Sequence, residues 1–489
     1  MNNISRMRME RAGVQLQPRL HYGAFPALTS YADLSDVVGL GPDTTAYYYK
    51  VTAKLFSEHL VEFERPGLIL EIDPIFDFTY GDEVVNQIST LQNRQNLYTN
   101  TRGFAISAKV GNVVYIYTDF QETQARVPGY VDRFVDSLGV IPGNGRVKPF
   151  AEDAFDYNMA NGFVGISPTK WLSFQAGHFK QFVGHGHRSL LLSDNAFNYP
   201  FAKYIIQLWE GKVQYQYSIG LHQNLRRLPQ GDAPESLFQR KYMSWNYLSY
   251  KPIPSVEIGF FESVMWKSYD VVEGTQPFNP NALNPLIFVN TGVLGLSDSH
   301  NNAMVGVNFA WQPLEKLRFY AQYMRDGNEP LTDGYQLGAK YYRFLNRIDF
   351  GLEYNEAAPL AYISENSLQG YSHNNQPLAH PLGAGFKEWI GTVTYLHKRI
   401  YARGEFMTAR LNRTGRDPLL TSANQSDRGA ETQVQFIDLQ LAYIFNPSTN
   451  MQVYGGFTDR NEQHLGDNLQ NQFWYLGLRT YLHNSYRNF

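Results

Sequence analysis

The sequence of 489 residues contains no cysteine, which excludes thiol catalysis, iron–sulfur clusters and thiolate zinc sites. It contains no run of about 18 or more apolar residues, so it predicts no transmembrane helix. The formal net charge is only −3, and nothing in the pattern of basic residues indicates a nucleic-acid partner. Residues 1–13 also lack the apolar centre of a secretory signal peptide, and we expect that such a peptide has been removed from this sequence.

Aromatic residues, in contrast, are abundant. The chain has 34 Tyr and 32 Phe, yet its mean hydropathy is −0.38. This combination is typical of strands that present one face to lipid and the other to a wet interior. Apolar and polar residues alternate with a period of two in the segments 213–222, 317–324, 348–355 and 400–407. The alternation predicts β-strands with one face toward hydrocarbon and one face rich in charges and amides.

The connections between the predicted strands alternate between short and long. Short turns are expected near residues 111–112, 168–169, 210–211, 252–254, 312–315, 345–346, 397–398 and 447–448. Longer connections are expected at 81–100, 125–156, 183–199, 223–238, 270–301, 327–333, 358–385, 412–431 and 461–470. Regular alternation of this kind indicates a transmembrane antiparallel β-barrel of roughly 18 strands, with both chain ends on the short-turn, periplasmic side. The long loops are then expected to face outward.

The chain divides into two predicted regions. Residues 1–66 lack sustained alternation and are too short to favour a self-sufficient domain, so we interpret them as a periplasmic or plug segment. Residues 67–489 form the predicted outer-membrane barrel. A barrel of this width encloses an aqueous lumen unless something fills it. We expect the N-terminal segment and inward-folded loops to fill it.

The loop at 183–199 is the densest in glycine, histidine and charge. Gly184 and Gly186 permit positive φ angles, and Arg188 offers five hydrogen-bond donors. The apolar triplet 190–192 predicts that the loop folds inward or lies on the rim. Ser193, Asp194 and Asn195 can close an Asx-type turn. Two interpretations stay open: a self-packed loop that constricts the pore, or a polar ligand site formed by Gly184, Gly186, His187, Arg188, Ser193, Asp194 and Asn195.

The histidines in and beside this loop raise the question of an enzyme or metal site. His185 and His187, with His178, could bind a metal, but the adjacent glycines leave the backbone loose. Ser189 or Ser193 with His187 and Asp194 would make a triad, yet these residues lie too close in sequence for its usual geometry. We therefore predict no catalytic residue, no metal site and no cofactor, and expect hydrogen-bonded loop histidines.

Two carboxylates on a polar strand face could in principle form an acid–base pair. Asp349 and Glu353 share a face but lie about 13 Å apart along one strand. A glycosidase pair needs roughly 5–9.5 Å. We expect Arg318, Asp349, Glu353, Arg403 and Glu405 to be solvated charges that face the lumen, with Arg403 and Glu405 as an ion pair.

The segment 182–203 carries a family resemblance. Its Gly-His-Gly-His-Arg-Ser-Leu-Leu-Leu-Ser-Asp-Asn core closely resembles a motif of the gliding-motility RemB-like proteins of Bacteroidota. It is similar, more distantly, to the Ser-Leu-Ile-Leu-Ser-Asn-Asn-Ala segment of the capsule-assembly Wzi family. Further stretches that resemble the RemB-like pattern are 100–104, 123–130, 140–148 and 373–388. Arg188, Ser193, Asp194 and Asn195 match the motif, whereas His185 and His187 depart from it.

The resemblance implies an outer-membrane β-barrel, and we predict that this barrel has no enzymatic activity. RemB-like proteins are tied to gliding and type 9 protein secretion, so the resemblance implies an accessory or scaffold component of that surface machinery. Its partners would be outer-membrane lipid and machinery subunits or lipoproteins. Wzi proteins are barrels that bind capsular polysaccharide, so the first alternative is binding and attachment of a capsular or exopolysaccharide. The second alternative is a diffusion porin.

Overall fold

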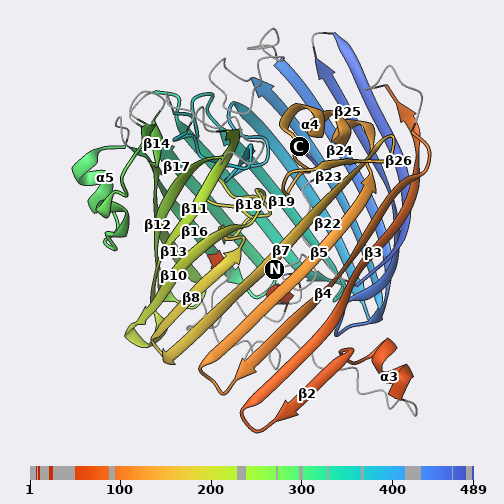
Figure 1. Cartoon of the computed structure of the whole chain (residues 1–489), viewed down its shortest axis with the longest axis horizontal. Coiled ribbons are helices and arrows are strands. Elements are labelled where there is room, and N and C mark those ends of the chain that lie inside the picture. The colour runs from red at the N-terminus through yellow and green to blue at the C-terminus, as the bar shows by residue number, and fades with distance from the viewer. Residues whose placement is uncertain are drawn as a thin grey trace.

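The protein is described by a computed structural model, shown in Figure 1. The residues it describes are 7, 9–11, 21, 23–25, 50–87, 94–227, 238–270, 274–296, 301–327, 330–364, 368–412, 431–464, 466–480 and 487–489. Within these residues, eighteen antiparallel strands form one closed barrel. The predicted fold class and strand number are confirmed.

The ring strands follow one another in chain order. They are β3 (Leu68–Asn86), β4 (Leu97–Val110), β5 (Val114–Arg126), β7 (Ala154–Thr169), β8 (Leu172–Phe179), β10 (Tyr199–Leu208), β11 (Val213–Arg227), β12 (Phe238–Ile253), β13 (Val256–Lys267), β16 (Asn301–Leu314), β17 (Leu317–Asp326), β18 (Asp333–Phe344), β19 (Ile348–Ala357), β22 (Phe386–His397), β23 (Ile400–Asn412), β24 (Glu431–Asn446), β25 (Met451–His464) and β26 (Asp467–Arg479). The ring closes where β26 pairs with β3, for example Trp474 opposite Asp82. Closure leaves the ring without an edge strand whose N–H and C=O groups would stay unpaired in hydrocarbon.

The remaining elements belong to connections and chain ends. They are β1 (Ala24–Phe25), α3 (Lys50–Phe56), β2 (Val61–Arg65), α4 (Gly129–Leu138), β6 (Lys148–Phe150), β9 (Phe182–Val183), η2 (Trp209–Gly211), β14 (Tyr269–Asp270), β15 (Gly274–Thr275), η3 (Pro280–Leu283), α5 (Val289–Leu294), β20 (Ser372–His373) and β21 (Gln376–Pro377). Among the described residues, no helix is both long and apolar enough to cross a membrane.

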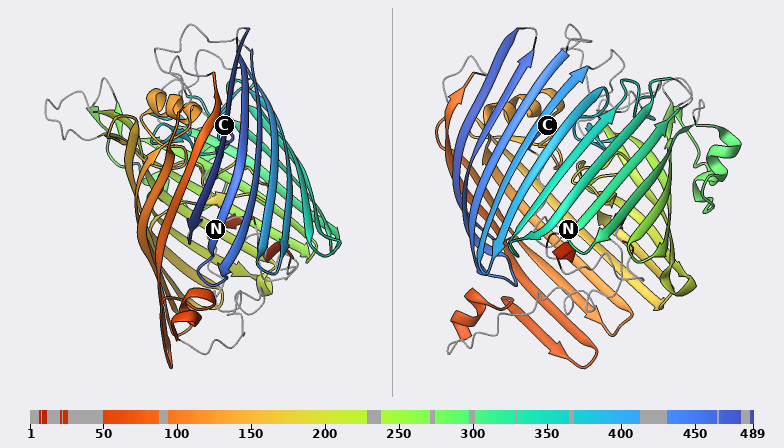
Figure 2. Two further views of the ribbon diagram at one scale, coloured as in Figure 1. Left: turned by 90° about the vertical axis from the view of Figure 1, so that its right-hand side faces the viewer. Right: turned by 180° about the vertical axis from the view of Figure 1, so that it is seen from behind.

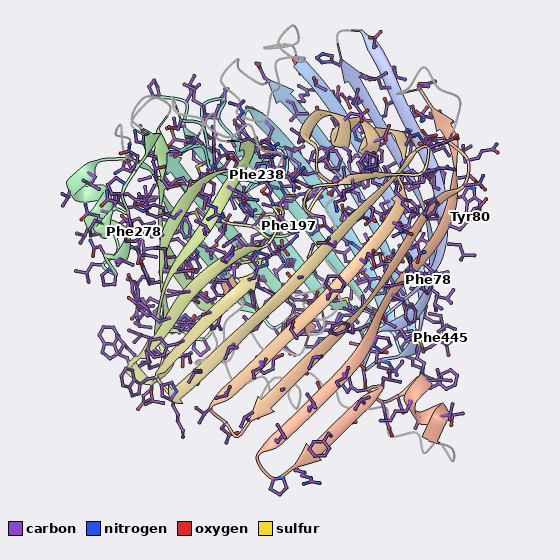
Figure 3. All side chains as sticks on the ribbon, in the orientation of Figure 1. Phe78, Tyr80, Phe197, Phe238, Phe278 and Phe445 are labelled. Carbon is purple, nitrogen blue, oxygen red and sulfur yellow. The ribbon has the colours of Figure 1, made fainter. Side chains whose placement is uncertain are left out.

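The two faces of the strands differ as the alternation predicts. On β24, Leu439 and Leu441 are exposed on the outer face, whereas Asp438 and Gln440 line a cavity on the inner face. Figure 3 shows Phe78 and Tyr80 on β3, where they contribute to the aromatic outer surface. An apolar, aromatic exterior around a polar interior is the pattern of a barrel that has lipid as its outer solvent.

The short turns lie where the sequence predicts them, but one predicted long connection is wrong. Residues 461–470 belong almost entirely to β25 and β26, in which His464 pairs directly with Asp467. Polar residues dominate this stretch, so the period-2 apolar signal stops although the strand continues. The two strands therefore extend as a paired hairpin to a tight turn.

Both chain ends contact the lumen as well as the short-turn side. In the N-terminal region, Arg11 forms an ion pair with Asp349 (2.7 Å), and Lys340 forms one with Glu10 (2.7 Å). Residues 50–66 take a different course: α3 and β2 lie beyond the short-turn rim, where β2 forms a hairpin with the start of β3 (Figure 2). Whether residues 1–66 act as one plug segment stays a prediction.

The C-terminal residues differ from the expectation that both chain ends lie on the short-turn side. The barrel wall ends there at Arg479, but the ring of Phe489 contacts that of Phe134 on α4, with centroids 4.5 Å apart. Figure 1 places the C-terminus beside α4. The last wall strand thus ends on the expected side, whereas residues 487–489 lie inside the barrel.

Candidate functional site in the barrel lumen

The loop between β8 and β10 folds into the lumen. Leu190, Leu191 and Leu192 are 0% exposed and belong to the largest hydrophobic cluster of the protein. Within the loop, β9 pairs with β1 of the N-terminal region, and the N–H of Val183 donates to the C=O of Leu192 (2.8 Å). The apolar triplet therefore holds the loop inward by burial, and the loop is anchored to the N-terminal region by backbone pairing.

Arg188 ties this loop to the opposite wall and to the C-terminus. Its guanidinium donates to the C=O of Asn488 (2.8 Å) and forms a buried ion pair with Glu388 on β22 (3.4 Å). The backbone N–H of Arg188 donates to Glu353 on β19 (3.0 Å). His380 completes the cluster at 2.8 Å from Glu388. Two carboxylates buried in the lumen are therefore compensated by the inward loops.

Ser193, rather than Asp194, closes the predicted turn. The N–H of Asn195 donates to Oγ of Ser193 (3.1 Å), and that hydroxyl donates to the C=O of Ala379. The amide of Asn195 donates to the C=O of Pro377 (3.2 Å). The expected Asx-type turn is thus a serine turn, because the Ser193 hydroxyl lies between the local backbone and the loop at 358–385.

The two loop glycines have different physical roles. Gly184 has a φ of +153°, in the range that favours glycine. Gly186 is not among the residues with positive φ, which corrects its predicted role. A Cβ on Gly186 would lie 2.5 Å from Oε2 of Glu353 and 2.7 Å from the C=O of Arg188. Gly186 is required by close packing rather than by backbone conformation.

His185 and His187 of the loop, and His178 near the end of β8, point toward separate partners. His185 lies 2.7 Å from the guanidinium of Arg318, His187 lies 3.6 Å from Glu405, and His178 lies 3.0 Å from the C=O of Ala160. The described residues include no group of three or more His, Asp or Glu side chains that could hold a metal ion. Ser189 and Ser193 both donate their hydroxyl hydrogens to backbone carbonyls. The geometry is that of hydrogen-bonded structural groups.

The five predicted lumen charges do face inward, but the expectation that they are solvated is wrong. Arg318, Asp349, Glu353 and Glu405 are buried, and Arg403 is half-buried. Each of the three carboxylates has a specific partner: Arg11 for Asp349, the N–H of His187 for Glu353 (2.6 Å), and Arg403 for Glu405. The reason is that loops and chain ends occupy the lumen and replace water as hydrogen-bonding partners.

The loop at 358–385 connects the inward segments to one another. Gln376 accepts from the N–H of Gly143 (2.7 Å) and donates to the C=O of Asn144 (2.7 Å), both in the connection between β5 and β7. His373 accepts from the N–H of Gln223 (3.1 Å) and lies 3.2 Å from the C=O of Asn198. Burial lowers the pKa of His373 to about 3, so its ring is neutral at pH 7.

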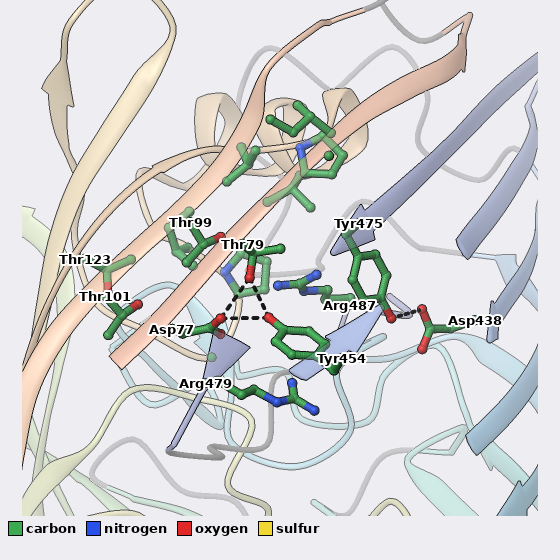
Figure 4. Close-up of a pocket in the computed structure, with 18 of the residues that line it drawn as sticks. Asp77, Thr79, Thr99, Thr101, Thr123, Asp438, Tyr454, Tyr475, Arg479 and Arg487 are labelled. Carbon is green, nitrogen blue, oxygen red and sulfur yellow. Dashed lines mark hydrogen bonds between the residues drawn. The ribbon is translucent and has the colours of Figure 1, made fainter. Parts of the chain in front are cut away.

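A cavity of about 310 Å³ lies between these inward segments and the wall formed by β3, β4 and β23–β26. Figure 4 shows Asp77, Tyr454 and Arg479 on one side of it and Tyr475 with Asp438 on the other. The hydroxyl of Tyr454 donates to Asp77 (2.7 Å), and that of Tyr475 donates to Asp438 (3.2 Å). The guanidinium of Arg479 lies 3.8 Å from the ring centre of Tyr454.

The C-terminal tail brings Arg487 into this cavity. The side chain lines the cavity together with Arg403 and Arg479, and the residue is exposed. Arg403 is paired with Glu405, and Arg479 donates to Gln440 (3.1 Å). Among the described residues, Arg487 forms no direct hydrogen bond or ion pair, although Asp77 in the cavity wall attracts its charge. The cavity therefore combines tyrosine rings, carboxylates that already accept hydroxyl hydrogens, and one guanidinium open to a ligand.

Sequence reasoning missed these cavity residues. Asp77, Tyr454, Tyr475 and Arg479 lie on strands without a distinctive motif, and Arg487 follows the last strand. The only signal in the sequence was that alternate residues of β3, β25 and β26 are polar and therefore face the lumen. Many other strand residues share that signal, so it does not single out these ones. Barrel closure, which joins the first and last strands, is what brings them together.

The family model described as capsule assembly protein Wzi matches residues 84–473. The chain belongs to this family. Among solved structures it is similar to Wzi of Escherichia coli, described as an outer membrane protein involved in group 1 capsule assembly and a carbohydrate-binding β-barrel. The TM-score is 0.55 at 13% identity, with 98% of this chain and 99% of that chain covered. At this identity the likeness shows a shared fold.

A weaker likeness links the chain to porins. The BenF-like porin of Pseudomonas fluorescens Pf-5 matches with a TM-score of 0.47 at 8% identity, covering 85% of this chain and 99% of that chain. Nothing further follows from a likeness at this level. The comparison with curated proteins found no match.

Family membership settles the coarser part of the sequence predictions. The protein is an outer-membrane β-barrel of the Wzi family. The closer RemB-like resemblance, with its assignment to Bacteroidota and to gliding or type 9 secretion, has no counterpart among these findings and stays a prediction. The comparisons favour the capsule-related alternative over it.

Proposed function

We propose that this protein binds a surface polysaccharide and helps to attach it to the cell, with the lumen cavity as the ligand site. Two observations support the proposal. The chain belongs to the capsule assembly Wzi family, and the E. coli Wzi that shares its fold is described as carbohydrate-binding. The cavity of about 310 Å³ is at the small end of the range for ligand pockets, which suits one or two sugar units of a longer chain.

The chemistry of the cavity lining suits a sugar that carries an anionic group. Tyrosine rings such as Tyr454 offer an apolar face for a sugar ring and a hydroxyl at the edge. Arg487 offers a planar set of donors that matches a carboxylate in two parallel hydrogen bonds. Because Arg403 is already paired with Glu405, Arg487 is the cation that we assign to an anionic sugar.

The decisive experiment measures binding of polysaccharide extracted from the surface of the producing bacterium to the detergent-solubilised protein. Replacing Arg487 with Ala should weaken binding about 10- to 100-fold, since hydrogen bonds to charged groups contribute roughly 1.5–3 kcal/mol. Arg410→Ala is the matched control, because Arg410 is an exposed arginine on β23 outside the lumen. Binding of neutral dextran and of acidic alginate is measured in parallel. Dextran tests recognition of the sugar ring alone, and alginate adds recognition of the sugar carboxylate.

Two results would contradict this function. The first is wild-type protein that binds none of the extracted polysaccharide. The second is a deletion strain whose capsule remains attached in the same amount as in the parent strain. Equal binding by Arg487→Ala and wild-type protein would remove the cavity from the proposal.

The gliding or type 9 secretion role is tested independently. Purification in a mild detergent that preserves complexes should then recover machinery subunits or lipoproteins with this chain. Recovery of the chain with lipid alone counts against an accessory or scaffold role in that machinery.

A further inference from the structure

The connection between β13 and β16 contains a segment, residues 274–296, that lies on the outside of the barrel. We call this segment the outer flap. Figure 1 and the right panel of Figure 2 show its helix α5 beyond the wall, next to the strands β12 and β13. Contacts agree with the pictures, since α5 contacts β13 and η3 contacts β12. The loop was expected to extend outward from the rim, but this part of it turns back along the wall.

The flap covers wall residues that the strand alternation assigns to lipid. Tyr217 belongs to the predicted outer face of β11, yet it is only 6% exposed, and its hydroxyl donates to the C=O of Ala282. The neighbouring outer residue Tyr215 donates to the C=O of Pro285. From the flap, the N–H of Asn279 donates to the hydroxyl of Tyr242 (2.7 Å).

Beneath the flap lies a carboxylate on the outer face of the wall. Glu262 is in the middle of β13, has the same parity as the exposed outer residue Phe260, and is 0% exposed. It accepts hydrogen bonds from the N–H of Phe288 (2.7 Å) and from the N–H (3.1 Å) and hydroxyl (2.9 Å) of Thr291. The amide of Asn246 donates to it from β12 (3.2 Å). A carboxylate here would otherwise face hydrocarbon, and the flap supplies three of its four donors.

The flap itself has the properties of a segment that lies in an apolar solvent. Residues 274–296 contain no Asp, Glu, Lys or Arg. Three prolines, at 277, 280 and 285, remove backbone donors. Many remaining donors are used within the flap: Ala282 and Asn284 donate to carbonyls of η3 and its cap, and Gly292 and Gly295 donate within α5. Satisfied backbone groups are the condition for placing a non-strand segment at membrane depth.

The side of the flap that faces away from the wall is mostly apolar, although Thr275 and Asn281 are also exposed. Val293 is 77% exposed and Leu286 is 62% exposed. Phe278, which Figure 3 labels at the same edge of the barrel, is also exposed, as is Leu283. This surface continues the apolar outer face of the neighbouring strands, where Phe260 and Leu221 are exposed.

We propose that the outer flap is embedded in the outer leaflet of the membrane and binds the acyl chains of the lipids there. The absence of charge, the internal use of backbone donors and the continuity with the lipid-facing wall all favour hydrocarbon as its surroundings. Glu262 anchors the flap from the wall side. The flap thus replaces one strip of the smooth barrel exterior by a separate lipid-contacting surface.

The chain has no native cysteine, so a spin label can be placed at one site only. The experiment uses full-length Val293→Cys protein, labelled with a nitroxide and reconstituted into liposomes of phosphatidylcholine and lipopolysaccharide. Collision of the label with oxygen, which concentrates in hydrocarbon, is compared with collision with a water-soluble nickel chelate. Leu441→Cys on the wall strand β24 and Leu331→Cys in the connection between β17 and β18 are references, since both leucines are 61% exposed.

The expected result is that the oxygen-to-nickel collision ratio at position 293 equals that at position 441 and exceeds that at position 331 at least severalfold. A ratio at 293 equal to that at 331 places the flap in water and overturns the proposal. Low collision with both reagents, in contrast to position 441, means that another protein surface covers the flap, and this also overturns it.

Discussion

At the scale of single residues, the lumen depends on side chains that connect segments far apart in sequence. Arg188 is the strongest case, because its guanidinium bridges the inward loop, Glu388 on the wall and Asn488 near the C-terminus. Removal of one partner of a buried ion pair leaves the other charge uncompensated, which costs more than the pair contributes.

We expect Arg188→Ala to destabilise the folded barrel by about 3 kcal/mol, the lower end of the range for breaking a buried pair. The folded, fast-migrating form on a gel should then disappear at a lower sample-heating temperature than in the wild type. Arg410→Ala, which removes an exposed arginine, should leave that temperature unchanged. An Arg188→Ala protein with wild-type heat-modifiability would show that Arg188 does not stabilise the fold.

Gly186 leads to a second prediction at this scale. In Gly186→Ala the new Cβ lies against the carboxylate of Glu353 and the backbone of Arg188, so we expect a loss of about 1–3 kcal/mol from overpacking. Gly391→Ala is the control, since a Cβ there meets nothing within 4 Å. The same heat-modifiability measurement compares the two variants, and equal stability of both would refute the packing argument.

At the scale of elements, the inward loops contact one another inside the barrel. The loop at 358–385 joins the other inward connections through Gln376 and His373. These contacts depend on a neutral His373, whose Nδ1 accepts the N–H of Gln223. Protonation removes that acceptor and places a charge near Lys241, Lys180 and His178.

Acidification should therefore loosen this loop. The folded-state pKa of His373, about 3, lies below its ordinary value of 6.5, so the unfolded loop binds more protons between these values. The stability that His373 contributes is fully present above pH 6.5 and is lost as the pH falls from 6.5 toward 3. The protection factors of the amides at 371–382, which divide the intrinsic exchange rate at each pH by the measured rate, should fall over this window. His373→Gln should flatten the dependence, and an unchanged slope in that variant would assign it to another group.

At the scale of the whole molecule, the contents of the lumen distinguish this barrel from an open pore. Eighteen strands enclose enough space for an aqueous channel, yet the described loops and chain ends pack against the inner wall. Of the three predicted functions, the diffusion porin is therefore the one that the packing favours least.

Conductance measures this property of the whole barrel. We expect the wild-type protein in a planar bilayer to show little or no single-channel conductance. Replacing residues 371–382 with a short Gly-Ser linker should raise it, because that segment packs against two other inward connections. Large, stable wild-type channels would restore the porin interpretation.

Much of the architecture could be predicted from local sequence. The alternation of apolar and polar residues predicts which face of each strand meets the membrane. The regular alternation of short and long connections predicts a barrel and its number of strands. Both signals can be read in the sequence because they depend only on residues that are close to one another along the chain. The inward position of the loop at 183–199 could also be predicted from Leu190–Leu192, since three consecutive leucines need a buried environment.

The site and the flap were decided by tertiary structure alone. Asp77 and Tyr454 are far apart in sequence and meet only because the ring closes between β26 and β3. The lumen charges are buried because distant loops and the C-terminal tail replace water around them. Glu262 and Tyr217 have the parity of outer residues, and only the fold of the segment at 274–296 covers them. Local periodicity assigns a residue to a face of a strand, whereas long-range contacts determine what that face meets.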